Sequence, residues 1–490
     1  MALKEFIVAI ELGSSKIRGI AGKKNVDGSI QVLSLVEEDA TACIRKGMVY
    51  NIDKTSLCLQ NIIKKLKQNI KTDIAQVYVG VGGQSVLSVR NVIVKQLPNE
   101  EIITTDMINE IMDNNRSMTY PDKEILDAVT LEYKVGTQHQ IDPVGVSAKS
   151  IEGNFLNILQ RKALYNNLNK CFERAGISIA EVYLAPIALA DSVLTETEKR
   201  LGCVLVDLGA DTTTMAVYYR NILRHLVVLP LGGSNVTKDL TVLKMEESEA
   251  EKMKLKYACA HTEPEENGDE TKEETYTIEG DRKVSAEDFN NIVEDRMFEI
   301  IKNAWSQVPE GIVGKVSSGG IILTGGGSNM KNIKQAFTHA TNVTKIRIAS
   351  KTTLTINTDI RELAANNGTY NTLIGLLSKG DLNCAGSPTS RTLFPEVEQP
   401  VNSGAGIQTA GSVTSNKQEQ ERIERERKEA DDKRRAEEEL AAQQVKLAEE
   451  RRRFEEEQAQ ANKKGGFMNG FGKKVKTWLT KIVSEGEDEK

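Results

Sequence analysis

The 490-residue sequence is poor in the residues that build zinc sites and in long apolar runs. It contains four histidines and six cysteines, and no two cysteines stand at the spacing of metal ligands, which argues against a Cys/His zinc site. Scattered, unpaired cysteines are typical of a reducing compartment. No stretch approaches the roughly 18 apolar residues of a membrane span, and no apolar run follows a basic N-terminus. We therefore expect a chain that is neither secreted nor membrane-spanning.

The balance of charge argues against a further class of partner. Lys and Arg total 64 against 70 Asp and Glu, so the net charge of −6 gives no overall basic field for nucleic acid. Hydrophobic residues make up 39% and charged residues 27% of the chain, as in a soluble protein with a charged appendage. The length allows two to four domains.

One short pattern occurs twice in the chain. A buried-looking strand reaches an acid, a tight turn through glycine and then hydroxyl residues, first as Glu11-Leu12-Gly13-Ser14-Ser15-Lys16 and again as Asp207-Leu208-Gly209-Ala210-Asp211-Thr212-Thr213. Glycine lets phosphate approach the backbone closely, while hydroxyls and successive N–H groups donate to phosphate oxygens. The acid can hold a hydrated cation. Two such hairpins predict two halves that close on one nucleotide.

A third loop follows the strand-like run 321–324 and consists of Gly325-Gly326-Gly327-Ser328-Asn329-Met330. Backbone without side chains suits close contact with a sugar or a base. The order of these three loops resembles the actin-like ATPase superfamily, with its two phosphate loops and one adenosine loop.

Three features narrow the resemblance to the bacterial cell-division FtsA family. The block 84–165 stands where that family carries its own small subdomain, the run 185–195 precedes the second phosphate loop and Leu223-Arg224-His225 follows it, and an amphipathic helix ends the chain. The resemblance implies an α/β fold: an actin-like ATPase fold of two lobes around a nucleotide cleft, with an FtsA-type inserted subdomain, then a linker and the C-terminal helix.

The implied domain organisation divides the chain as follows. Part of the first lobe occupies 1–83, the inserted subdomain 84–165, and the second lobe 166–384, with a helical subdomain at about 236–320 and a last part that returns to the first lobe. A flexible and then charged linker occupies 385–464, the amphipathic helix 465–484 and an acidic tail 485–490. The charged part of the linker, 417–464, lacks sustained apolar heptads, which favours a single solvated helix over a coiled coil.

The resemblance also implies the residues of the site, with ATP and Mg²⁺ as cofactors. The phosphate loops would be Gly13, Ser14, Ser15 and Lys16, and Asp207, Gly209, Thr212 and Thr213. The glycines that open the next helix near the nucleotide would be Gly232 and Gly233, and the helix flanking adenosine would carry Glu251 and Lys254. The adenosine loop would be Gly325, Gly326, Gly327 and Met330. The magnesium ion would be held, through water, by Glu11 and Asp207.

Two departures from the superfamily pattern bear on catalysis. Glu11 replaces the usual Asp, which moves the carboxylate one methylene outward, and Ala210-Asp211 replaces Gly-Gly. Asp211 brings negative charge toward the phosphates and needs compensation by a cation or by Lys16. The sequence offers no general base for an attacking water, and no catalytic residue is assigned. We expect ATP binding with at most slow hydrolysis.

The end of the chain has the pattern of an amphipathic helix. Its apolar face, at i, i+4, i+7, i+8, i+11 and i+12, consists of Phe471, Val475, Trp478, Leu479, Ile482 and Val483. The other side carries or is flanked by Lys473, Lys474, Lys476 and Lys481. This composition favours the surface of an anionic membrane, with docking on a partner protein as the alternative. One such helix binds weakly, so firm attachment needs many copies on one assembly.

The resemblance implies a function in cell division. The protein would bind ATP, polymerise head to tail through 84–165, and lie as a peripheral protein on the cytoplasmic side of the cell membrane at the division site. It would anchor the FtsZ ring there and help recruit downstream division proteins. The FtsZ C-terminal peptide would dock on the helix 288–304, with Arg296 as a contact. The alternatives are a pilus-assembly-type actin-like scaffold and a sugar-kinase-like phosphotransferase, and the basic C-terminal helix disfavours both.

Overall fold

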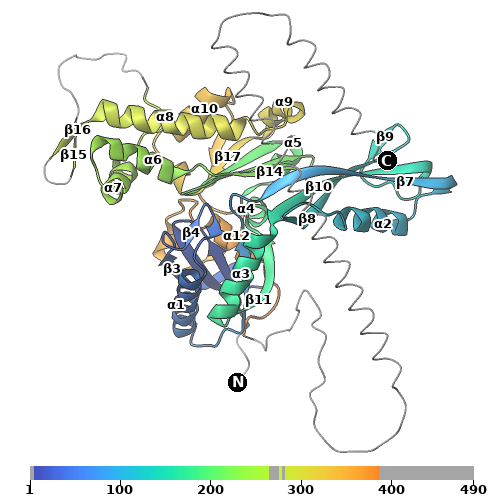
Figure 1. Cartoon of the computed structure of the whole chain (residues 1–490), viewed down its shortest axis with the longest axis horizontal. Coiled ribbons are helices and arrows are strands. Elements are labelled where there is room, and N and C mark those ends of the chain that lie inside the picture. Colours follow the sequence, from blue (N-terminus) through green and yellow to red (C-terminus); the bar gives the residue numbers. More distant parts are fainter. Residues whose placement is uncertain (1–4, 264–274, 279–281, 386–490) are drawn as a thin grey trace, which may run out of the picture. The chain divides into compact units, whose positions relative to one another are not determined.

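The computed structural model describes residues 5–263, 275–278 and 282–385. The predicted linker after residue 385, the amphipathic helix at 465–484 and the acidic tail lie outside the described residues, as does most of the acidic stretch at 262–275. The proposed domain boundaries stay predictions. The described residues form two large sheets, two small hairpins and the helices that pack on them (Figure 1).

The first sheet is mixed and has the strand order β11-β6-β1-β2-β3-β19. Its strands are β1 (Ile7–Leu12), β2 (Lys16–Lys24), β3 (Ile30–Asp39), β6 (Gln76–Val81), β11 (Ser178–Leu184) and β19 (Ile356–Asn357). The β1–β2 and β2–β3 pairs are antiparallel, whereas β6 runs parallel to β1 and to β11. A small hairpin, β4 (Ile44–Arg45) and β5 (Met48–Val49), follows β3.

Helices cover both faces of the first sheet (Figure 1). On one face α1 (Ile52–Ile70) packs against β3 and α3 (Lys162–Ala175), and a side chain at Gly19 would meet Ile62 of α1. On the other, α12 (Asn371–Lys379) packs on β1 and α4 (Ala185–Val193), with Leu376 against Gly80. Ile62, Ile63 and Leu66 lie on the buried face of α1.

The second sheet has the order β18-β17-β12-β13-β14-β7-β10-β8-β9. Its first part comprises β12 (Cys203–Leu208), β13 (Thr213–Tyr219), β14 (Ile222–Leu229), β17 (Gly320–Thr324) and β18 (Ile346–Ile348). Alternate residues of β12 enter different cores: Cys203 and Leu205 join the core of the first sheet, while Val204 and Val206 face a second core. Burial on both faces explains why the first four residues of β12, 203–206, form a continuous apolar run.

Further described helices and a small hairpin precede, separate or follow these strands in the chain. They are α5 (Glu196–Leu201), α6 (Gly233–Leu240), α7 (Glu247–Tyr257), α8 (Ala286–Trp305), α9 (Glu310–Gly319), α10 (Ile333–Thr341) and α11 (Arg361–Ala364), with the short helices η1 (Thr241–Leu243) and η3 (Gly326–Asn329) and the hairpin β15 (Thr275–Thr277) and β16 (Lys283–Ser285). Of these, α6, α7, α8, α9 and α10 contribute buried residues to the second core. Ser285 caps α8 by accepting a hydrogen bond from the Asp288 amide, and the stripe with Phe289, Val293 and Met297 is buried.

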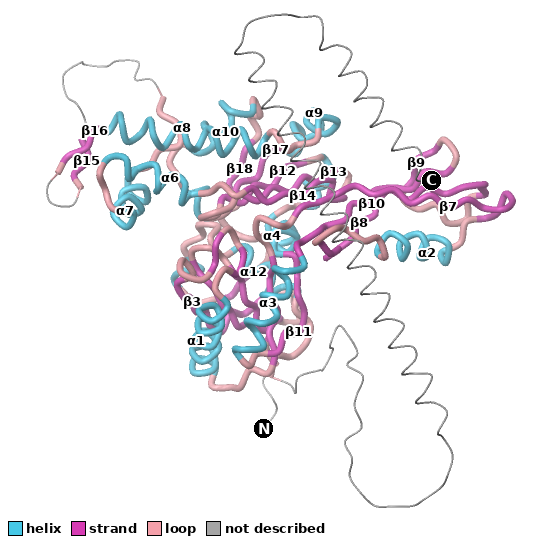
Figure 2. Tube along the Cα trace, viewed as in Figure 1, coloured by secondary structure: helices cyan, strands magenta, loops and turns pink. Residues whose placement is uncertain are grey.

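The rest of the second sheet is antiparallel and consists of β7 (Leu87–Ile102), β8 (Lys123–Val135), β9 (Gln138–Gln140) and β10 (Ser147–Arg161). Helix α2 (Thr105–Arg116) lies along these strands, as Figure 2 shows, and closes a third small core in which Tyr133 meets Phe155 edge-on. This group joins β14 at the single register pair Leu87–Val227.

Candidate nucleotide site

The two predicted phosphate loops have the same backbone geometry. In the β1–β2 turn the Gly13 amide donates to the Lys16 carbonyl at 3.1 Å, and in the β12–β13 turn the Gly209 amide donates to the Thr212 carbonyl at 2.9 Å. A Cβ atom on Gly13 would lie 2.7 Å from the Lys16 oxygen, and one on Gly209 would lie 2.8 Å from the Thr212 oxygen. Both turns are therefore too tight for any residue but glycine.

The acid before each turn lies at the base of the site. The Glu11 side chain is 17% exposed, and within the described residues its Oε2 atom has no hydrogen-bond partner. Burial raises the pKa of Glu11, against the opposing charge of Arg18. Burial, followed by the charge of Glu11, raises the pKa of Asp207 to about 7. The negative charges of two carboxylates from the two hairpins thus oppose each other.

These two acids fit a divalent cation. A positive charge would stabilise the buried Glu11 oxygen, which has no hydrogen-bond partner among the described residues, and the ionised form of Asp207, whose pKa is raised. The described residues contain no cluster of three or more His, Cys, Asp and Glu side chains suited to a metal, so water and phosphate oxygens would complete the shell. Mg²⁺ commonly keeps several waters beside one or two carboxylates.

Arg18 is a functional candidate that lies outside the acid–Leu–Gly pattern of the two loops. It stands directly opposite Glu11 in the β1–β2 register, with Nη1 3.7 Å from the Glu11 Oε2 atom. Its Nε atom donates to Glu37 at 2.7 Å, and its guanidinium lies 5.3 Å from the ring centre of Tyr370. The sequence could have identified Arg18 through the hairpin turn, because a tight turn after Gly13 places residue 18 across from residue 11.

The hydroxyl residues of the two loops are placed differently from one another. Ser14 accepts a hydrogen bond from the Gly47 amide at 2.8 Å, and Ser15 is exposed. Thr212 is partly exposed, whereas Thr213 is fully buried in β13 and donates its hydroxyl proton to the Leu231 carbonyl at 2.8 Å. The Thr213 hydroxyl is therefore already used in a hydrogen bond within the protein.

Lys16 contacts neither acid of the site. It opens β2, and its ammonium lies 3.6 Å from Asp39. The sequence suggested that Lys16 or a cation compensates the negative charge of Asp211. In the structure, Asp211 instead accepts a hydrogen bond from the backbone amide of Lys46 at 3.1 Å.

The predicted glycine pair begins α6 beside the second loop. Gly232 is the N-cap, the Gly233 amide donates to Gly209 and the Ser234 amide donates to Ala210. A Cβ on Gly232 would lie 2.5 Å from the Ala210 oxygen, so only glycine allows this approach. The N-terminus of α6, with its positive end of the helix dipole, is therefore attached directly to the second loop.

Glu251 and Lys254 fasten α7 to the start of α6. The Lys254 ammonium donates to the Gly233 carbonyl at 3.1 Å, to the Thr237 hydroxyl at 2.9 Å and to Glu251 at 2.6 Å. Glu251 also accepts from the Thr237 hydroxyl at 2.5 Å. The pair thus lies beside the glycines at the start of α6, and its contact with adenosine stays a prediction.

The third loop meets the second one. Gly325 has φ +82°, and a Cβ there would lie 2.2 Å from Oδ1 of Asp207 and 2.7 Å from the Leu208 oxygen. Gly326 has open space around it, Gly327 approaches Leu208, and Met330 caps η3. The ends of β12 and β17, which run parallel, therefore bring the second acid and the triple glycine together.

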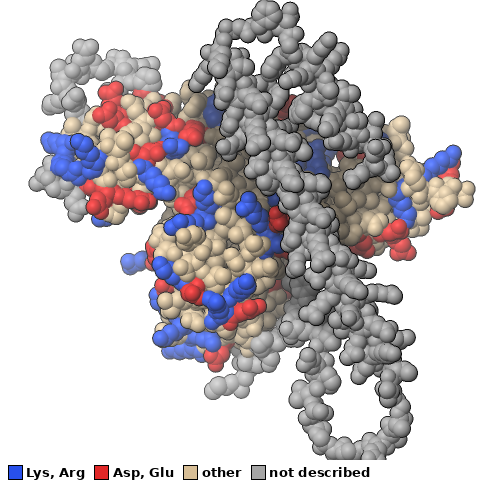
Figure 3. Space-filling view, viewed as in Figure 1, with Lys and Arg blue, Asp and Glu red and all other residues tan. Residues whose placement is uncertain are grey.

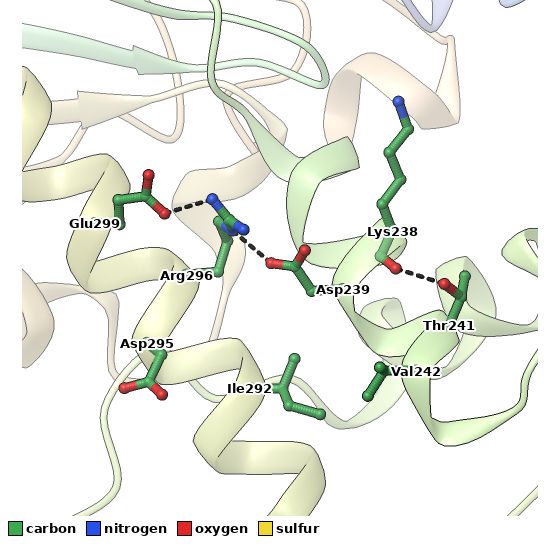
Figure 4. Close-up of a pocket in the computed structure, with 8 residues that line it drawn as sticks. All are labelled: Lys238, Asp239, Thr241, Val242, Ile292, Asp295, Arg296 and Glu299. Atoms are coloured by element: carbon green, nitrogen blue, oxygen red, sulfur yellow. Dashed lines mark hydrogen bonds and ion pairs between the residues drawn. The ribbon is translucent and has the colours of Figure 1, made fainter. Parts of the chain in front are cut away.

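A separate cavity of about 500 Å³ lies between α6, η1 and α8. Figure 4 shows that Arg296 of α8 points across it toward α6, where it pairs with Asp239, while Glu299 pairs with the same guanidinium. The remaining residues that line it are Lys238, Thr241, Val242, Ile292 and Asp295. Val242 is 74% exposed, so an apolar group with charged neighbours is open to solvent here.

Two further surface properties follow from the described residues. Basic and acidic side chains are interspersed on the face that Figure 3 shows, in keeping with the absence of an overall basic field. None of the described helices combines the length and apolar character needed to cross a membrane.

Comparisons with known proteins agree with this geometry. The family model "Cell division protein FtsA" matches residues 204–375, and the model "SHS2 domain inserted in FTSA" matches residues 83–159. The chain is 34% identical to the cell division protein FtsA of Porphyromonas gingivalis over 333 residues, which cover 67% of this chain and 69% of that protein. It is 30% identical to the FtsA of Neisseria meningitidis, over 67% of this chain and 80% of the relative.

A solved structure supports the fold. The structure titled "PilM-PilN type IV pilus biogenesis complex" superposes with a TM-score of 0.55 at 14% identity, over 76% of this chain and 97% of that one. At this identity the likeness concerns the fold alone, and the expected actin-like ATPase fold with an inserted subdomain is confirmed. The family matches favour neither the pilus scaffold nor the sugar kinase. The chain is a member of the family of the cell division protein FtsA.

Proposed function

We propose that this cell-division protein binds ATP with Mg²⁺ between its two phosphate loops and polymerises on the cytoplasmic face of the cell membrane. It anchors the FtsZ ring there through its C-terminal helix and helps to recruit later division proteins. The observation that carries the nucleotide part is the pair Glu11 and Asp207. Each is the penultimate residue of a strand that leads into a glycine turn, and the charge of Glu11 helps to raise the pKa of Asp207.

Each part of the nucleotide would have its own partners. The turn amides and the hydroxyls of Ser14 and Thr212 would bind phosphate oxygens, and the start of α6 would add its dipole. The bound Mg²⁺ would supply charge neutralisation between the phosphates and the two acids. The site holds no general base assigned to an attacking water, so its main output would be the relative position of the lobes.

The FtsZ C-terminal peptide would occupy the cavity between α6 and α8. Ile292 and Val242 offer apolar contact, and the Arg296 guanidinium is held in place by Asp239 and Glu299. An acidic group of the peptide would exchange with one of these carboxylates, so Arg296 is oriented before binding.

Membrane attachment would come from residues 465–484, whose apolar face and lysines suit an anionic surface. A polymer would present many such helices at once, so that weak single contacts add to firm attachment.

The deciding experiment is sedimentation of the full chain with anionic liposomes and FtsZ, with and without ATP. We expect the protein to pellet with the liposomes and to bring FtsZ with it. A chain that ends at Lys464 should stay in the supernatant, and Trp478→Glu should prevent pelleting while ATP binding is unchanged. Equal pelleting of either variant and the full chain would refute the membrane role of the tail.

A further inference from the structure

The tip of the β4–β5 hairpin touches both phosphate loops. The Gly47 amide donates to the Ser14 hydroxyl oxygen at 2.8 Å, and the adjacent Lys46 amide donates to Oδ2 of Asp211 at 3.1 Å. Ser14 belongs to the first loop and Asp211 to the second, 165 residues from Lys46 in the chain. Two consecutive backbone amides of one turn therefore bridge the two hairpins of the site.

The turn has a backbone that keeps these amides in place. Lys46 and Gly47 have φ values of +51° and +70°, a conformation typical of a tight two-residue hairpin turn. Gly47 packs against Gly83 so closely that a Cβ on Gly47 would lie 2.6 Å from the Gly83 Cα atom. The Lys46 carbonyl accepts from the Gln84 amide at 3.0 Å. Gly83 and Gln84, which precede β7, thus hold the tip in place, and the tip directs its amides toward the loops.

We propose that Asp211 is a positioning residue that holds the Lys46–Gly47 turn against the second phosphate loop and thereby restricts the phosphate end of the cleft. The role rests on the proposed nucleotide function. Among the described residues, Asp211 is the residue of the second loop to which the turn donates a hydrogen bond. Ser14, which accepts the other hydrogen bond, lies on the same side of the proposed cleft as the turn. A carboxylate is a strong acceptor for an amide, and a glycine or alanine at 211 would offer no side-chain acceptor.

This placement also gives a reason for a negative charge near the phosphates. The carboxylate is engaged by a backbone donor of the first lobe, so its charge serves a contact between lobes. Nucleotide that enters or leaves past this turn must do so with the Asp211–Lys46 hydrogen bond broken or shifted. Loss of the acceptor should therefore speed nucleotide release, apart from any change in electrostatic repulsion.

Two variants of the full chain separate the acceptor from the charge. Asp211→Ala removes both, whereas Asp211→Asn keeps a carbonyl acceptor and removes the charge. Hydrogen–deuterium exchange resolved to single amides, in nucleotide-free protein, reports the contact directly. We expect exchange at the Lys46 amide to be about five- to tenfold faster in Asp211→Ala and within about twofold of wild type in Asp211→Asn. The Gly209 amide, which donates within its own loop, is the internal control and should not change.

Release of a fluorescent ATP analogue, followed by stopped flow, tests the consequence. Release should be faster from Asp211→Ala and no faster than wild type from Asp211→Asn. Equal Lys46 exchange in wild type and Asp211→Ala would overturn the positioning role, as would an Asp211→Asn variant that behaves like Asp211→Ala. If wild-type protein binds no nucleotide, the proposed function and the restriction of the cleft both fail, while amide exchange still decides whether Asp211 positions the turn.

Discussion

Nη1 of Arg18 lies 3.7 Å from Oε2 of Glu11, directly across the β1–β2 hairpin and slightly too far for a hydrogen bond. The Arg18 side chain is only 16% exposed, and its guanidinium also pairs with Glu37. Arg18 therefore offsets the charge of an acid that would otherwise be buried alone. This relationship makes Arg18 part of the proposed cation site although it lies outside both predicted phosphate loops.

Replacement of Arg18 should destabilise the fold. Arg18→Ala leaves Glu11 and Glu37 without their shared partner, and breaking a mostly buried pair costs about 3 kcal/mol. The free energy of unfolding, measured with urea, should fall by that order. The pKa of Glu11, which the Arg18 charge lowers, should rise further. Arg18→Lys keeps the charge and should lie between; an Arg18→Ala protein as stable as wild type would contradict the assignment.

The pKa of Asp207 predicts how stability depends on pH. Its pKa is raised to about 7 from an ordinary 3.8, so between these values the folded protein retains a proton that the unfolded chain has released. The stability contributed by this proton is complete below about pH 4 and is lost as pH rises through 7. Without Mg²⁺, Asp207→Asn should therefore be more stable than wild type at pH 8, and the difference should vanish below about pH 4.

Asp207 should also make cation binding depend on pH, but in the opposite direction to stability. Protonated Asp207 is a poor ligand, so the Mg²⁺-dependent affinity for an ATP analogue should increase from pH 6 to pH 8 in wild type. Titration calorimetry at several pH values measures this. Asp207→Asn should bind weakly at every pH, and an affinity of wild type that does not vary with pH would show that Asp207 is not the titrating ligand.

The triple glycine allows a matched pair of substitutions. Gly325→Ala places a Cβ 2.2 Å from the Asp207 carboxylate at a backbone φ of +82°, so the loop, the acid or both must move. We expect a loss of at least about 2 kcal/mol in stability and loss of nucleotide binding. Gly326→Ala, with no atom within 4 Å of its Cβ, should leave stability near wild type. Thermal unfolding distinguishes the two variants, and equal losses of stability would mean that the contact with Asp207 is unimportant.

Local sequence patterns predicted those parts of the site that depend on local geometry. The acid–Leu–Gly order implies a tight turn, and Gly13 and Gly209 both make the same turn hydrogen bond. The side on which a strand residue points was harder to predict: Thr213 and Thr214 alternate, and Thr213 is the buried one. The contact of Asp211 with Lys46 was beyond prediction, because the donor is a backbone amide, which every non-proline residue possesses, and it lies 165 residues away.

The cavity between α6 and α8 yields a prediction about the partner peptide. Arg296 is held between Asp239 and Glu299, and reversal of its charge places three carboxylates together beside Asp295. Arg296→Glu should therefore reduce affinity for an FtsZ C-terminal peptide by about tenfold or more, as measured by fluorescence anisotropy. Lys302→Glu is the control, because Lys302 lies on the same helix, is exposed, and contacts Phe298 outside the cavity. If both variants bind the peptide equally well, the cavity is not its site.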